Sequence, residues 1–144
     1  MKFTNTKGFT LIELLVVIAI IGILSSIVLA SLNSARDKGA NAAVKADLQG
    51  VRSQAEITYD NDNQSYANVC SNSNIVNALT HALTVGGDAN VGGTVANRCN
   101  NTASAWAINA LLKTPEGANN YWCVDSAGKG KGEANELASA TVCS

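Results

Sequence analysis

One apolar segment near the N-terminus limits what this chain can fold into more than any other feature. No charged residue occurs among the 22 residues from Leu14 to Ala35. As an α-helix, such a segment would extend ~33 Å at ~1.5 Å per residue, enough to cross a hydrocarbon core of ~30 Å. The sequence therefore predicts a helix that spans a membrane.

A single carboxylate, Glu13, interrupts the start of this apolar block. A carboxylate at the bilayer centre costs roughly 2.5–3.5 kcal/mol, and less near an interface. A helix that served only as a tether would gain nothing from that cost. Glu13 is therefore expected to have a partner.

A short basic leader precedes the apolar block. By the positive-inside rule, Lys2 and Lys7 are expected to keep the leader in the cytoplasm. A secretory signal peptide is cut after an apolar core of roughly 7–15 residues, at a small-residue site that is not found here. Any cleavage is instead expected in front of the apolar block, and a cut between Gly8 and Phe9 would place a new ammonium group four residues before Glu13. The amine of the same chain or of a neighbouring subunit could then pair with Glu13 and fix the axial register of packed helices.

Residues 8–13, Gly-Phe-Thr-Leu-Ile-Glu, and the apolar run after them resemble the class III signal of type IV pilins and pseudopilins. The resemblance covers about the first 30 residues. It implies that a membrane prepilin peptidase cuts after Gly8 and N-methylates Phe9, and that Glu13 is required for assembly. Many family members have a proline eight residues after the position that matches Gly22, where this chain has Ala30.

The resemblance also implies a location and partners. Residues 1–8 would be a cleaved cytoplasmic leader, residues 9–35 a transmembrane and filament-core helix, and residues 36–144 a globular head outside the cytoplasm. Before assembly the chain would cross the inner membrane once. An assembly platform in that membrane would then add it to a homo-oligomeric helical filament, the extracellular pilus.

Net charge does not favour binding of nucleic acid. The formal charge is −1, and removal of residues 1–8 with their two lysines takes it to −3. Nucleic-acid-binding domains usually carry a basic surplus. No specific nucleic-acid partner is therefore expected.

The helix is predicted to continue past the membrane edge, from about Thr10 to about Tyr59. Its second half has the apolar spacing of three and four that marks one stripe of an amphipathic helix. The stripe consists of Ala40, Val44, Leu48, Val51, Ala55 and then Thr58 or Tyr59. We expect this half to lie against a sheet. A second, short helix is predicted from Asn74 to about Leu83, and residues 84–104 are predicted to form a surface loop.

Strand patterns occur only near the C-terminus. Residues 104–112 alternate in polarity, and Thr-Pro-Glu-Gly at 114–117 is predicted to end that strand. Further strands are predicted at 120–125 and at 132–137. The expected fold class is α+β: a long N-terminal helix whose second half packs on a small C-terminal antiparallel sheet, which is the pilin architecture.

Four cysteines are expected to form two disulfides. Cys70, Cys99, Cys123 and Cys143 lack the Cys-x-x-Cys spacing of a zinc site, and cysteines outside a membrane usually pair. Three connectivities are possible. Cys70–Cys99 with Cys123–Cys143 is favoured because each pair closes a local segment, and the family resemblance implies the C-terminal pair in particular.

No enzyme, cofactor or metal site is expected. The chain has one histidine, His81, which leaves no Ser/His/Asp or Cys/His arrangement, and no glycine-rich phosphate loop follows a strand. Asp125, Glu133 and Glu136 do not make a recognisable calcium site. Two functions remain: a type IV pilus subunit for attachment, twitching motility or DNA uptake, or a pseudopilin of a type II secretion system. A monomeric anchored binding protein is disfavoured by Glu13.

Overall fold

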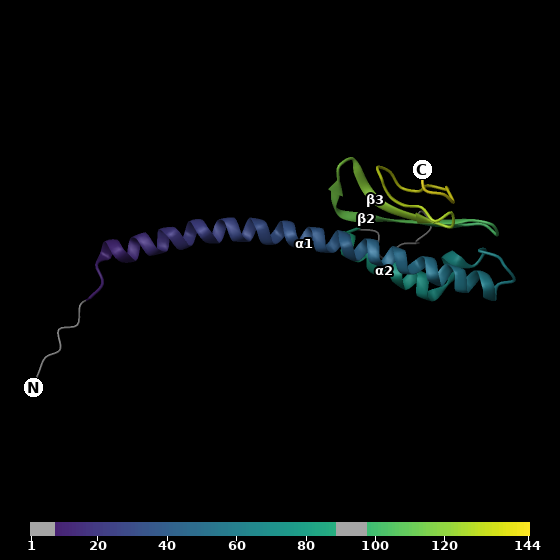
Figure 1. The fold of residues 1–144 in the computed structure, drawn as a ribbon, viewed down its shortest axis with the longest axis horizontal. Coiled ribbons are helices and arrows are strands. Elements are labelled where there is room, and N and C mark those ends of the chain that lie inside the picture. Colours follow the sequence, from purple (N-terminus) through teal and green to yellow (C-terminus); the bar gives the residue numbers. More distant parts are fainter. Residues whose placement is uncertain (1–7, 89–97) are drawn as a thin grey trace, which may run out of the picture. The chain divides into compact units, whose positions relative to one another are not determined.

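The computed structural model describes residues 8–88 and 98–144. The chain divides into two compact units, one ending at Arg36 and the other running from Asp37 to Ser144. Helix α1 (Leu11–Asn61) contributes to both units (Figure 1). Its bounds lie within two residues of the predicted ones.

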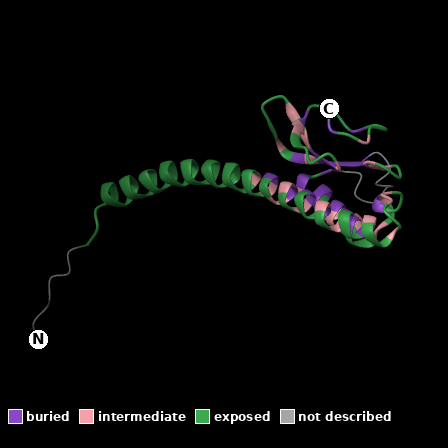
Figure 2. Ribbon diagram, turned by 45° about the vertical axis from the view of Figure 1, so that its right-hand side comes forward, coloured by how far each residue is buried: buried purple, intermediate pink, exposed green. Residues whose placement is uncertain are grey.

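The first unit is an apolar helix without a core. Its large apolar side chains, from Phe9 to Leu32, are between 89% and 44% exposed, and Figure 2 shows this part of α1 as exposed throughout. Within the described residues, α1 is the one helix long and apolar enough to cross a membrane. Apolar surface of this extent must be covered by lipid or by other helices.

The second unit has its core between α1, a second helix and a sheet. The stripe predicted on α1 is confirmed at five positions, because Val44, Leu48, Val51, Ala55 and Thr58 are buried. The buried residue at the start of the stripe is Asn41, whereas Ala40 is only half-buried. Leu48 and Val51 join one apolar cluster with residues of the other elements, among them Ile75, Leu79, Trp106 and Ile108.

Helix α2 (Ser73–Gly86) follows a one-turn 3-10 helix, η1 (Val69–Ser71). The side chain of Asn72 caps α2 by accepting hydrogen bonds from the amides of Asn74 and Ile75. Gly87 ends the helix in the left-handed conformation, with φ of 82°. The prediction of this helix is confirmed, with three more residues at its C-terminal end.

Four antiparallel strands form one sheet in the order β1-β2-β3-β4. Their bounds are β1 (Cys99–Asn101), β2 (Trp106–Glu116), β3 (Asn119–Asp125) and β4 (Gly130–Glu133). The predicted strand at 120–125 is confirmed as β3. The pairs Ala110↔Trp122 and Trp122↔Gly132 fix the register of the three longest strands.

Three boundary predictions are wrong. The predicted loop at 84–104 contains the last turn of α2 and strand β1, and its residues 89–97 lie outside the described part. Strand β2 continues through Pro115 to Glu116, because its pairing with β3 becomes irregular between Leu111 and Glu116, where a missing amide is tolerated. The predicted strand at 132–137 is displaced to β4, because the chain leaves the sheet after Glu133.

The C-terminal segment, residues 134–144, covers the second face of the sheet. It contains no strand, yet its Leu137 and Cys143 are buried in a cluster with Ala107 and Cys123. This cover explains why successive residues of β2 from Trp106 to Ala110 are all buried. Alternation in the sequence predicted one buried face, and the C-terminal segment buries the other.

Candidate processing and assembly site

The residues of the predicted cleavage site lie just before α1. Gly8, Phe9 and Thr10 have no regular secondary structure and are exposed. A Cβ atom at Gly8 would meet no atom of residues 8–88 or 98–144 within 4 Å. The bond between Gly8 and Phe9 is therefore open to a peptidase in this conformation.

Thr10 and Glu13 form a capping box at the start of α1. The backbone amide of Thr10 donates to Glu13 Oε2 at 2.8 Å and its hydroxyl donates to the same oxygen at 2.7 Å. In return, the amide of Glu13 donates to Thr10 Oγ1 at 3.2 Å. This reciprocal pattern satisfies amides that the first helical turn would leave unpaired.

The capping box supplies a partner for Glu13 that sequence reasoning missed. The signal was present, because a threonine three residues before a glutamate at the start of an apolar run is the sequence mark of a capping box. Both bonds from Thr10 go to Oε2. A carboxylate can accept about four hydrogen bonds, so this cap leaves Glu13 able to accept an ammonium group as well.

Two disulfides join the cysteines of the second unit. Cys70 bonds to Cys99 with Cα atoms 5.6 Å apart, and Cys123 bonds to Cys143 with Cα atoms 5.9 Å apart. These are the pairs favoured from the sequence. The first links η1 to β1, and the second ties the C-terminal segment to β3.

Peptide mapping of the oxidised protein without reduction checks these pairs. We expect peptides that link Cys70 to Cys99 and Cys123 to Cys143, since the fold brings the Cα atoms of each pair within 6 Å of each other. A peptide linking Cys99 to Cys123, or free thiols at all four positions, would contradict this arrangement.

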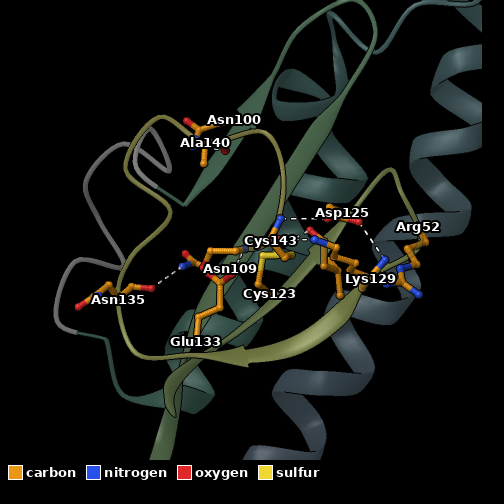
Figure 3. Close-up of a disulfide and its surroundings, with 12 residues drawn as sticks. Arg52, Asn100, Asn109, Cys123, Asp125, Lys129, Glu133, Asn135, Ala140 and Cys143 are labelled. Carbon is orange, nitrogen blue, oxygen red and sulfur yellow. Dashed lines mark hydrogen bonds between the residues drawn. A yellow bond between two sulfur atoms is a disulfide. The ribbon is translucent and has the colours of Figure 1, made fainter. Parts of the chain in front are cut away.

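Acidic residues near the second disulfide act as hydrogen-bond acceptors for the chain itself (Figure 3). Asp125 is buried and accepts from the amides of Lys129 and Cys143, each at 2.9 Å. Glu133 accepts from the amide of Ser144 at 2.5 Å and from its hydroxyl at 2.9 Å. Lys129 Nζ donates to the carbonyl of Cys143 at 2.9 Å.

A charged link joins α1 to the far end of β2. Lys45 Nζ lies 2.6 Å from Glu116 Oε2 and also sits over the ring of Trp122 at 4.6 Å. The hydrogen bond from Lys45 lowers the pKa of Glu116 below its ordinary value. Asn41 adds a bond to the carbonyl of Thr114 at 2.8 Å. This link fixes the irregular end of β2.

His81 pairs with a carboxylate at the surface of the second unit. Its Nδ1 lies 2.7 Å from Asp47 Oδ2, and its side chain is 64% exposed. The pair is a surface contact between α2 and α1.

Comparison with known proteins supports a class for the N-terminal part of the chain. The family described as "Prokaryotic N-terminal methylation motif" matches residues 3–29. The Type IV wide pilus major component PilA4 of Thermus thermophilus is 47% identical over 62 residues, which is 43% of this chain and 47% of that protein. No solved structure matches.

Two secretion proteins are also similar. The Type II secretion system core protein G of Klebsiella michiganensis is 38% identical over 66 residues, 46% of each chain. The protein of the same name from Dickeya chrysanthemi is 37% identical over 60 residues, 42% of this chain and 39% of its own. The chain therefore spans less than half the length of the curated relatives it matches.

The motif and these relatives support the type IV pilin and pseudopilin family, and the α+β fold described above fits it. The resemblance to this family, which was based on residues 8–13 and the apolar run, is confirmed by these matches. The motif and the apolar part of α1 also fit a chain that is anchored in a membrane.

Proposed function

We propose that this chain is a structural subunit of a type IV pilus, assembled through the apolar part of α1. The observation that carries the proposal is the N-terminal methylation motif at residues 3–29, together with the exposed large apolar side chains of the first part of α1, up to Leu32. A helix of this kind is unstable in water and needs a bilayer first and other helices afterwards. Glu13 at its start would pair with the amine of Phe9 in a neighbouring subunit.

The rest of the proposal follows from this role. The chain would act as a building block and not as an enzyme, and it would need no cofactor. Its partners would be a prepilin peptidase, an inner-membrane assembly platform and further copies of itself. The head, residues 36–144, would lie outside the cytoplasm, where the two disulfides can form.

A pseudopilin of a type II secretion system is the second candidate. The two core protein G relatives favour it, whereas the relative with 47% identity is a pilus component. The two candidates differ in where the assembled chain is found. A pilus subunit is recovered in fibres on the cell surface, and a pseudopilin stays within the envelope.

Shearing of intact cells tests the proposal. We expect the sheared material to contain fibres built from this chain, and we expect deletion of its gene to remove them. Recovery of the processed chain only in the envelope, with loss of protein secretion on deletion, would replace the proposal with the second candidate.

Processing gives a further prediction. Gly8→Leu is expected to block cleavage, because the side chain at this position must be small for the peptidase to reach the next bond, whereas Gly8→Ala should still be cut slowly. Intact-mass measurement of membrane fractions gives the result, with a wild-type sample as the control. Complete removal of residues 1–8 from Gly8→Leu would mean that the cut lies elsewhere.

A further inference from the structure

A polar cavity of about 340 Å³ lies where α1 ends, between its last turns and the segment that leads to α2. The described side chains that line it each carry a hydroxyl, an amide or a carboxylate group, and none of them is apolar or basic. They are Thr58, Asn61, Asp62, Asn68, Ser71 and Asn72. Such a lining offers both donors and acceptors of hydrogen bonds.

Two of the lining side chains, Thr58 and Asn72, are fixed by hydrogen bonds within the chain. Thr58 is buried, and its hydroxyl donates to the carbonyl of Gln54 at 2.8 Å. The side-chain amide of Asn72 donates to Thr58 Oγ1 at 3.0 Å, while its oxygen caps α2. This part of the lining is therefore held in place before any ligand binds.

Strand β1 holds the segment between α1 and α2 in place. The side chain of Asn101 donates to the carbonyl of Tyr66 at 3.0 Å and to that of Ala67 at 2.5 Å. The disulfide between Cys70 and Cys99 adds a covalent link to the same strand. The cavity is therefore preformed, and binding of a ligand requires little ordering of the chain.

The other four lining side chains make no hydrogen bond within residues 8–88 and 98–144. They are Asn61, Asp62, Asn68 and Ser71. Asn68 precedes η1 without capping it through its side chain. Asp62 follows the C-terminal end of α1, where the helix dipole disfavours a carboxylate. These four side chains do not hold the fold together through hydrogen bonds, and their polar groups are available to a ligand.

We propose that this cavity binds a neutral saccharide. The hydroxyl groups of a sugar both donate and accept hydrogen bonds, which matches a lining of amides, hydroxyls and one carboxylate. Asp62 disfavours an anionic ligand, and a polar lining disfavours a lipid or another apolar ligand. The volume falls within the range of roughly 300–1,000 Å³ that is typical of small-molecule sites, which is far more than a bare ion fills.

Saturation-transfer NMR of the full-length chain, in a detergent without sugar groups, tests this site. The probes are glucose, galactose and mannose, each added as the free monosaccharide. We expect saturation transfer to at least one of them, and an affinity at least about tenfold lower for the corresponding uronic acid, because its carboxylate would meet that of Asp62. Transfer to none of the three sugars, or equal binding of the uronic acid, would overturn the proposal.

Two aspartate variants locate the binding. Asp62→Ala removes the carboxylate from the lining and should lower the affinity at least about tenfold, because hydrogen bonds to a charged group are the strong ones. Asp60→Ala is the matched control: it removes an exposed carboxylate of the last turn of α1 that does not line the cavity, and it should leave the affinity unchanged. Both disulfides are checked by intact mass.

An unchanged affinity in Asp62→Ala, or an equal loss in both variants, would overturn the proposal. These measurements use the unassembled chain and involve no fibres, so their outcome is separate from that of the proposed function.

Discussion

Glu13→Leu is expected to leave the chain in the membrane and to remove most of it from filaments. The change abolishes the cost of a carboxylate at bilayer depth, which favours insertion. It also removes the group that would pair with the Phe9 amine of a neighbouring subunit, and an unpaired buried charge costs several kcal/mol. Since about 1.4 kcal/mol is a tenfold change in an equilibrium, the ratio of sheared fibre to membrane-held subunit should fall at least tenfold.

Two further variants separate the charge of Glu13 from its cap. Glu13→Gln keeps an oxygen for the amide and hydroxyl of Thr10 and should give an intermediate ratio. Thr10→Ala removes the hydroxyl and keeps the carboxylate, so it should assemble better than Glu13→Leu. Cleavage at Gly8 is checked in each variant by intact mass. Filaments of Glu13→Leu as abundant as those of wild type would show that the carboxylate does not pair between subunits.

Gly86→Ala is expected to destabilise the head strongly. A Cβ atom at this position would lie 2.0 Å from the carbonyl oxygen of Leu111 and 3.0 Å from its carbon. Both are backbone atoms of β2, so α2 and the sheet would have to separate. Overpacking of a core typically costs about 1–3 kcal/mol and occasionally more, and we expect a loss of at least about 3 kcal/mol.

Denaturant unfolding in detergent, followed by fluorescence of Trp106 and Trp122, measures this loss. Gly50→Ala is the matched control, because Gly50 is exposed in α1 and a Cβ atom there would meet nothing within 4 Å. It should raise the free energy of unfolding by up to about 1 kcal/mol through helix propensity. Equal midpoints for Gly86→Ala and wild type would mean that α2 does not approach β2 this closely.

Long periodic segments of this chain could be predicted from the sequence. The apolar spacing of Val44, Leu48, Val51 and Ala55 identified the buried face of α1, because a helix that packs on one side must repeat every three or four residues. The same pattern predicted the existence of α2, although not its last turn, and aromatic and β-branched residues predicted β3.

Periodic patterns did not predict that the C-terminal segment, residues 134–144, covers the second face of the sheet. The Cys123–Cys143 disulfide, which ties the C-terminal segment to β3, was predicted. The asparagine side chains from three strands and the buried leucine that also hold this segment leave no periodic pattern. Strand β1 is only three residues long and has polar residues at two of its positions. Such elements depend on contacts between residues far apart in the chain, which a local pattern does not contain.

The residues of the assembly site could be predicted in part from the sequence. The order of Gly8, Phe9 and Glu13 before an apolar run led to the expected processing and to the role of the carboxylate. The partner of Glu13 within its own chain, Thr10, was not predicted, because a charged partner was expected for a carboxylate at this depth, although the sequence has the spacing of a capping box.

The intact mass of the chain recovered from sheared surface fibres tests the central claim most directly. It reports in one sample whether the chain is in fibres and how its N-terminus was processed. We predict a chain that begins at Phe9, carries one added methyl group and contains both disulfides. A chain that retains residues 1–8, or one that lacks the apolar part of α1, would contradict the account.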